Sequence, residues 1–88
     1  MICGKTKTGF AFSVDENCMN DMELVDILAD DSTDEAFRMS KLLKKLLPGQ
    51  QRNALYDHVR VNGRVPVDAI VAEVGDIFAA MGNPGKNS

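Results

Sequence analysis

The apolar periodicity of residues 67–81 constrains the fold more than any other feature of this sequence. Apolar residues recur there at intervals of three and four, as one wide face of an α-helix requires. The residues of this face are Val67, Ile70, Val71, Val74, Ile77, Phe78 and Met81. Pro66 suits the first turn of such a helix. Because so wide a face needs several partners, we expect this helix to be the central element of a helical core. Gly75 lies off the apolar face, where it would allow another backbone to approach closely.

Residues 20–30 carry a second helical pattern. Asn20 or Asp21 is a suitable N-cap, and Asp21 and Glu23 in the first turn suit the helix dipole. The expected buried face consists of Met22, Val25 and Leu28, and it is widened by Leu24 and Ile27.

Residues 34–47 predict a leucine-rich helix. Its apolar stripe comprises Ala36, Met39, Leu42, Leu43, Leu46 and Leu47. Ser32 or Thr33 is expected to cap this helix. Pro48 ends it, because proline disfavours a helical conformation in the residue before it.

Residues 49–60 predict a third helix, which places Leu55 and Val59 inward. The dipeptide Asn62-Gly63 that follows is either a helix C-cap or a turn signal. Both alternatives end the helix before the long apolar helix begins.

Residues 6–14 alternate between apolar and small or polar side chains, as a half-buried strand does. Phe10, Phe12 and Val14 point one way, and Ala11 and Ser13 point the other. A turn at Gly9 would make 2–14 a small hairpin. The patterns together predict a mainly α fold, a small bundle of three to four helices with a short N-terminal β-strand or hairpin. We expect a single domain over residues 1–81 and a flexible tail over residues 82–88.

Charge is segregated along the chain, although the formal net charge is only −3. Residues 1–35 carry nine acidic residues and two lysines, whereas residues 36–64 carry seven basic residues and one aspartate. This pattern indicates complementary packing within the chain or between copies. The acidic balance argues against nucleic acid as a partner. No apolar run approaches the roughly 20 residues that span a bilayer, and the start of the chain lacks a signal-peptide pattern, so we expect no membrane contact and a cytoplasmic location.

The sequence shows no constellation of catalytic or metal-binding residues. No phosphate-binding glycine loop, nucleophile motif or zinc-protease motif is present. His58 has no evident carboxylate or nucleophile partner at helical spacing. Cys3 and Cys18 lack C-x-x-C spacing and are expected to be free thiols. The sequence therefore predicts a protein that is not an enzyme and needs no metal or cofactor.

Three short patterns, taken in order, carry a resemblance to a known family. The first is of the form D-x-E-L-x-x-x-L, the second of the form Q-x-x-x-L-x-x-H-x-R, and the third is G-R-V. Their residues are Asp21, Glu23, Leu24 and Leu28; Gln51, Leu55, His58 and Arg60; and Gly63, Arg64 and Val65. Over residues 6–88 the chain resembles the small tail assembly chaperones of long-tailed, siphovirus-like phages and prophages of Gram-positive bacteria.

This resemblance implies a chaperone that binds the tape-measure protein and keeps it soluble until the tail tube polymerises. It also implies contact with the major tail (tube) protein and self-association. Such proteins are sometimes made in two lengths, which raises the hypothesis of a ribosomal frameshift at the codons of residues 85–87. The candidate partner-binding residues are Leu42, Leu46, Tyr56, Ile77 and Phe78. The alternative function is a small phage-encoded DNA-binding or transcription-modulating protein.

Overall fold

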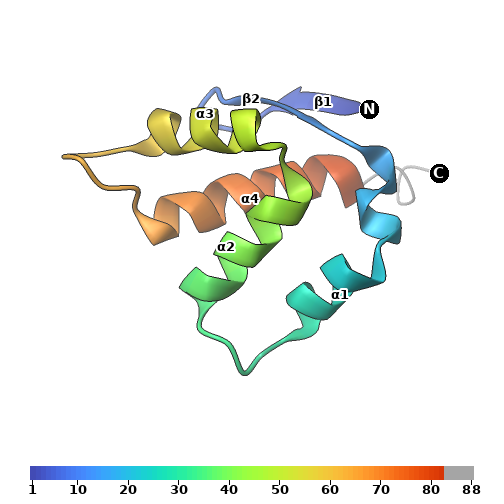
Figure 1. Ribbon diagram of the computed structural model, residues 1–88. Helices are drawn as coiled ribbons and strands as arrows, with labels where there is room; N and C mark the ends of the chain where they lie inside the picture. The colour runs from blue at the N-terminus through green and yellow to red at the C-terminus, as the bar shows by residue number, and fades with distance from the viewer. Residues whose placement is uncertain (83–88) are drawn as a thin grey trace.

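Four α-helices and an N-terminal β-hairpin make up the part of the chain that the computed structural model describes, which is residues 1–82 without the side chain of Met19 (Figure 1). The elements are β1 (Ile2–Lys5), β2 (Ala11–Val14), a 3₁₀ helix η1 (Glu16–Asn20), α1 (Met22–Ala29), α2 (Glu35–Leu46), α3 (Gly49–Val59) and α4 (Val67–Gly82). The predicted fold class, a small mainly α bundle with an N-terminal hairpin, is therefore confirmed. The predicted tail falls almost wholly outside the described residues, as do the frameshift positions 85–87.

The hairpin pairs β1 with β2 in antiparallel register, with Ile2 opposite Val14. Gly9 lies in the connecting loop with φ of +94°, a conformation that glycine adopts without steric cost. The predicted alternation is confirmed, because Phe10, Phe12 and Val14 are all buried. The strand is shorter than the pattern suggested, since residues 6–10 form the loop and not part of β2.

Helix α4 is central, as expected, and contacts β1, α2 and α3 (Figure 1). The buried part of its apolar face consists of Ile70, Val74, Ile77 and Met81. Val67, at the start of the helix, remains 44% exposed. The expectation for Gly75 is wrong: a Cβ atom there would meet nothing within 4 Å, so no backbone approaches it.

Helix α2 buries the leucines of its predicted stripe, but its N-terminus is not capped as expected. Asp34 occupies the N-cap position without a side-chain hydrogen bond. The Thr33 and Ser32 hydroxyls instead donate to the carboxylate of Asp30, at 2.6 and 2.7 Å. These bonds lower the pKa of Asp30 to about 2, because they favour its charged form. Ala36, at the start of the predicted stripe, is exposed.

Helix α1 buries only part of the predicted face, on the side of Leu24 and Ile27. Leu24 is buried, whereas Met22 is 69% exposed and Val25 and Leu28 are each 38% exposed. Asp21 caps the helix as expected, accepting a hydrogen bond from the Glu23 amide at 2.9 Å. The same two acidic side chains form ion pairs with Lys45 of α2. Burial of Leu24 sets the rotation of α1, which leaves the Met22 side uncovered.

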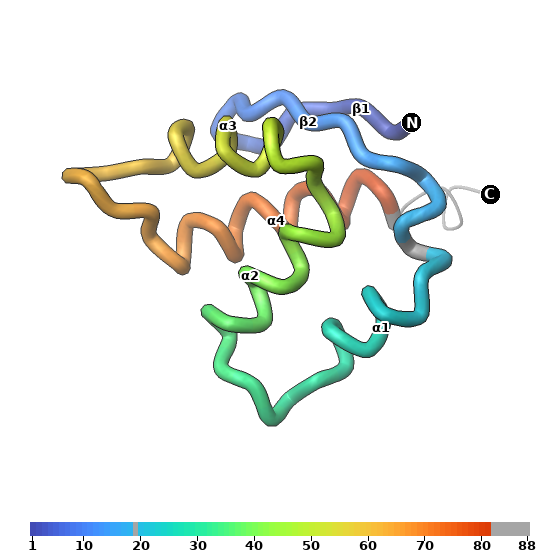
Figure 2. Tube along the Cα trace, in the orientation of Figure 1, coloured from blue at the N-terminus to red at the C-terminus, as the bar shows by residue number. Residues whose placement is uncertain are grey.

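The connection between α3 and α4 is a tight turn at Asn62-Gly63. Both residues have positive φ, 54° and 79°. The Val61 amide donates to the Arg64 carbonyl at 2.8 Å, and the Arg64 amide donates to the Val61 carbonyl at 3.0 Å. This is the geometry that Asn-Gly favours in two-residue hairpin loops, so the dipeptide is a turn and not a helix C-cap. Figure 2 shows the turn projecting at one end of the molecule, with α1 near the opposite edge.

Candidate partner-binding groove

Helices α2, α3 and α4 enclose a shallow apolar hollow of about 250 Å³. Its lining residues are Ala36, Met39, Ser40, Leu43, Tyr56, Val65, Val67 and Ile70. Helix α2 supplies the first four residues, and α3 supplies Tyr56. The last three come from the segment that leads into α4 and from its first turn. Seven of the eight lining residues are apolar or aromatic, so the hollow suits an apolar side chain better than a charged group.

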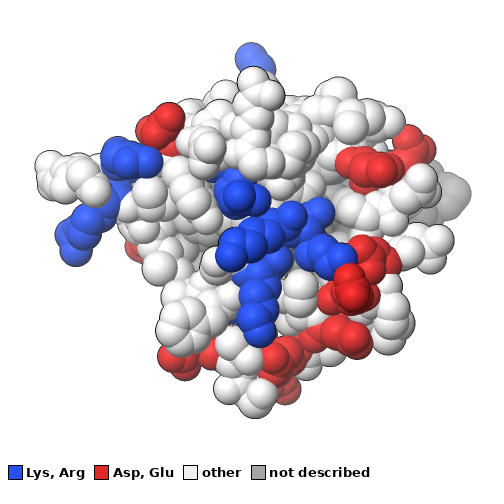
Figure 3. Space-filling view, in the orientation of Figure 1, with Lys and Arg blue, Asp and Glu red and all other residues white. Residues whose placement is uncertain are grey.

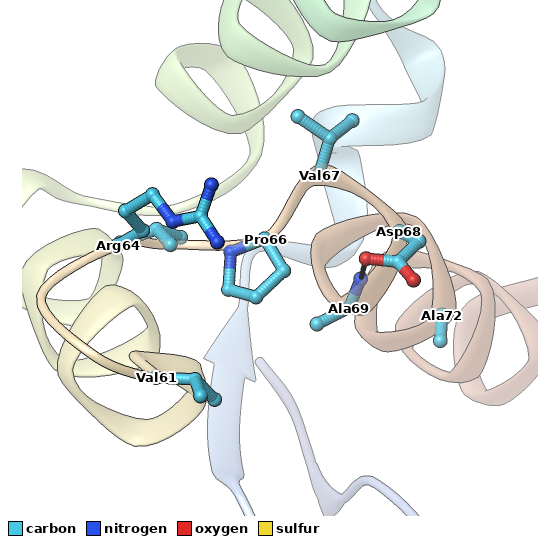
Figure 4. Close-up of a pocket in the computed structure, with 8 residues that line it drawn as sticks. Val61, Arg64, Pro66, Val67, Asp68, Ala69 and Ala72 are labelled. Carbon is cyan, nitrogen blue, oxygen red and sulfur yellow. Dashed lines mark hydrogen bonds between the residues drawn. The ribbon is translucent and has the colours of Figure 1, made fainter.

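A second, wider hollow of about 690 Å³ adjoins the first. It is lined by Val61, Arg64, Val65, Pro66, Val67, Asp68, Ala69 and Ala72. Figure 4 shows the turn residues on one side of it and the first turns of α4 on the other. The two hollows share Val65 and Val67 in their linings, and we call them together the apolar groove.

The valines of the apolar groove are poorly covered by the rest of the chain. Val61 is 56% exposed and Val67 is 44% exposed. The carboxylate of Asp68 accepts a hydrogen bond from the Ala69 amide of its own helix, at 3.0 Å (Figure 4). Contiguous apolar surface of this kind marks interaction sites more often than scattered single residues do.

Basic residues flank the apolar groove. Lys44 lies one helical turn after Ser40 on α2, and Arg52 lies one turn before Tyr56 on α3. Arg64 lines the wider hollow itself. Figure 3 shows Lys and Arg side chains over α2 and over the α3–α4 turn, with uncharged surface between them. Acidic side chains gather on the same view over α1 and the segment before α2.

Only one of the five predicted partner-binding residues lines the apolar groove. Tyr56 does so and is half-buried. Leu42, Leu46 and Ile77 are at most 3% exposed, so they are core residues that no partner can reach in this structure. Phe78 is half-buried and packs against the core. A small chain needs its strongest apolar residues for its own core, which explains the difference.

A polar cluster that the sequence did not predict connects the hairpin loop to α3 and α4. The Thr8 hydroxyl donates to Oε2 of Glu73 at 2.7 Å and lies 2.9 Å from Nε2 of His58. Since the Thr8 proton points to the carboxylate, we assign the His58 Nε2–H as the donor of the second bond. Glu73 is 2% exposed, and its Oε1 atom has no hydrogen-bond partner among the described residues.

The order of these groups differs from that of a nucleophilic triad. A nucleophile needs a base that accepts its proton and a third group that orients the base. Here the hydroxyl lies between the histidine and the carboxylate. The Lys7 amide donates to Asp76 at 2.9 Å in the same loop. The arrangement fastens the loop to α4.

Residues 1–82 show neither a metal site nor a membrane-spanning helix. No three of the His, Cys, Asp and Glu side chains there lie close enough to hold a metal ion. None of the helices described is long and apolar enough to cross a membrane. Cys3 and Cys18 are both free thiols, as expected. Burial raises the pKa of the Cys18 thiol, and the nearby Asp15 carboxylate adds to this effect.

No known protein family matches this chain, and neither a curated protein nor a solved structure is significantly similar to it. The described residues thus form a small, mainly helical fold with a partly exposed apolar groove.

Proposed function

We propose that this chain is a phage tail assembly chaperone that binds the tape-measure protein and keeps it soluble until the tail tube polymerises. The observation that supports the proposal is the apolar groove, together with the resemblance of the sequence to such chaperones. The client is a long helical protein with apolar stretches, which would aggregate if they were left in water.

The apolar groove suits an amphipathic helix. Such a helix places anchors at i, i+3, i+4 and i+7 into an apolar groove between helices. Met39 and Tyr56 line the narrower hollow, and a flexible thioether can adapt to different side chains beside a rigid ring. Each contact is small, so binding of many copies along one client would supply the overall affinity. Release to the tube protein is then possible one copy at a time.

A small DNA-binding protein is the second candidate, and the basic outer side of α2 favours it. Helical spacing places Arg38, Lys41 and Lys45 on one side of α2, with Lys44 beside them. However, Lys45 is already paired with Asp21 and Glu23. A smaller hollow between α1 and α2 also places Asp26 and Asp30 beside Arg38 and Lys41. These carboxylates would oppose a phosphate backbone, so we place DNA binding second.

Co-expression with a tape-measure protein from a phage of this kind tests the proposal. The parent chain is expected to keep the client in the soluble fraction. Val67→Glu places a charge in the apolar groove without opening the core, so it should leave the client insoluble. Ala54→Glu changes an exposed residue of α3 that does not line the groove and serves as the matched control.

Two results would contradict the proposal. The first is a client that is equally insoluble with and without the parent chain. The second is a Val67→Glu variant that protects the client as well as the parent does. Salt-dependent binding to duplex DNA at physiological ionic strength would favour the second candidate.

A further inference from the structure

Three basic side chains at the edges of the apolar groove have no counter-charge in the described part of the chain. They are Lys44 in the last turn of α2, Arg52 in the first turn of α3, and Arg64 in the α3–α4 turn. None of the three forms an ion pair with another described residue. Lys45 and Arg60, by contrast, are each paired with carboxylates of their own chain. We call the three unpaired residues the groove cations.

The groove cations lie at both ends of the groove. Lys44 follows the lining residue Ser40 by one helical turn, and Arg52 precedes the lining residue Tyr56 by one turn. Arg64 lines the wider hollow itself. Because α3 follows α2 almost directly, Lys44 and Arg52 belong to the corner between these two helices (Figure 1). Arg64 belongs to the turn at the other end of α3.

The carboxylates near the groove do not balance these charges. Asp68 is the one acidic residue in the lining of either hollow, among the described residues. It accepts a hydrogen bond from the Ala69 amide at 3.0 Å, in the first turn of α4, where the helix dipole stabilises a negative charge. Asp57, next to Tyr56, is paired with Arg60 at 3.1 Å. The groove therefore keeps unbalanced positive charge at its edges.

The apolar surface also extends beyond the lining of the groove. Phe37 is 64% exposed and lies one helical turn before Ser40, on the same side of α2 as Lys44. Val67 inside the groove is 44% exposed. A partner of this surface must cover apolar side chains at its centre and present negative charge at its borders, because complementary charge favours the correct partner.

We propose that the apolar groove selects amphipathic helices whose apolar face is bordered by acidic side chains, and that the groove cations determine this specificity. The inference rests on the proposed function, since it takes the groove as the site of a client helix. A client is then covered first where its apolar stretches are bordered by aspartate or glutamate.

Single-stranded nucleic acid is the other polymer that basic and aromatic side chains can bind. Its phosphates would suit the groove cations, and its bases could stack on Phe37 and Tyr56. However, the lining between them is mainly aliphatic and has few polar groups to meet the edges of bases. The net charge of −3 also opposes a polyanion. The observations favour the acidic-bordered helix.

Three synthetic peptides of about 18 residues, long enough to form helices, test the proposal. They share one apolar face of leucines and differ only in the border residues, which are glutamate, glutamine or lysine. Fluorescence anisotropy measures their binding to the full chain. An exposed ion pair changes affinity by about 1.5- to fivefold, so the glutamate peptide should bind roughly tenfold more tightly than the glutamine peptide. The lysine peptide should bind most weakly. The differences should shrink at about 1 M salt, where charges are screened beyond about 3 Å.

Charge reversal at the groove supplies the second arm of the test. The double variant Lys44→Glu, Arg52→Glu should prefer the lysine peptide to the glutamate peptide. Lys5→Glu makes the same kind of change at an exposed residue of β1 that does not line the groove, so it is the matched control and should keep the parent's preference. Val67→Glu should weaken the binding of all three peptides.

Any one of four outcomes would overturn the proposal. The parent binds the three peptides equally at low salt, or the double variant keeps the parent's preference while showing its circular dichroism. The third is a single-stranded oligonucleotide that displaces the glutamate peptide at physiological salt. The fourth is peptide binding that weakens as the protein concentration rises, which would place a second copy in the groove.

The same measurements separate this proposal from the proposed function. Equal binding of all three peptides, lost in Val67→Glu, contradicts selection by charge and leaves the proposed function standing. A chain that selects the glutamate peptide but fails to keep a tape-measure protein soluble contradicts the proposed function alone.

Discussion

At the scale of single residues, Thr8 has the clearest energetic role. Its hydroxyl is the one group that donates to the buried carboxylate of Glu73, among the described residues. A buried carboxylate that loses its donor bears an uncompensated desolvation cost. His58, 2.9 Å from the same hydroxyl, stacks at a tilt against Phe10, with ring centroids 5.6 Å apart.

We predict that Thr8→Val destabilises the protein by about 1.5–3 kcal/mol, because hydrogen bonds to charged groups contribute in this range. Thr8→Ser keeps the hydroxyl and is the matched control, with little expected change. Urea denaturation followed by circular dichroism measures both. Equal stability of the valine variant and the parent would show that the bond contributes nothing measurable.

The contact of His58 with Thr8, and through it with Glu73, could not be predicted from the sequence. Thr8 and Glu73 lie 50 positions before and 15 positions after His58, so no helical spacing relates the three residues. They meet because the hairpin loop folds back on α3 and α4.

Tyr56 could be predicted as a groove residue because it lies on a helix with few other apolar side chains. Leu42, Leu46 and Ile77 were equally apolar, and apolarity alone does not distinguish a core residue from a contact residue.

At the scale of elements, all four helices and the hairpin could be predicted from periodicity and turn residues. The orientation of α1 could not. Its apolar residues cover a wide arc, and the pattern favoured the side of Met22 and Val25 over that of Leu24. Burial of Leu24 depends on how α1 meets α2, as do the ion pairs of Lys45 with Asp21 and Glu23, and periodicity alone does not show that contact.

Helix α4 provides a prediction at this scale. Gly75 lies inside the helix, exposed, with open space where a Cβ would be. Gly75→Ala should therefore stabilise the protein by about 1 kcal/mol, since glycine is the poorer helix former by that amount. Thermal unfolding measures the effect as a higher Tm.

Gly63→Ala is the control for this prediction. Gly63 also has open space where a Cβ would be, but its φ is +79°, which strains any residue with a side chain. The alanine variant at position 63 should be less stable than the parent. A loss of stability at position 75 as well would mean that the helix interior requires glycine for another reason.

At the scale of the whole molecule, one core joins both ends of the described chain. Phe12 and Val14 of the hairpin belong to the same apolar cluster as Leu55 of α3 and Ile77 of α4. Part of the segregated charge is neutralised within the chain, because Lys45 pairs with Asp21 and Glu23. Exposed acidic side chains remain over α1 and the segment before α2, and exposed basic ones over α2 and the α3–α4 turn (Figure 3).

We predict that Ile77→Asp unfolds the whole domain and not just one helix. Ile77 is 0% exposed, and a buried, unpaired carboxylate costs on the order of 5 kcal/mol or more, comparable with the stability of a domain of this size. Ala72→Asp, at an exposed position of the same helix, should fold. Far-ultraviolet circular dichroism and amide dispersion in proton NMR distinguish these outcomes. A folded Ile77→Asp variant would show that the core tolerates rearrangement around α4.

The pairing of the hairpin with α4 also determines when this protein can fold during its synthesis. Thr8 and Glu73 are 65 positions apart, and Lys7 and Asp76 are 69 apart. At about 5–20 residues per second, a ribosome needs roughly 3–13 s to synthesise the chain between them. Phe10, Phe12 and Val14 are therefore synthesised long before the helix that covers them is complete. A protein proposed to shield the apolar segments of another chain thus exposes apolar segments of its own while it is nascent.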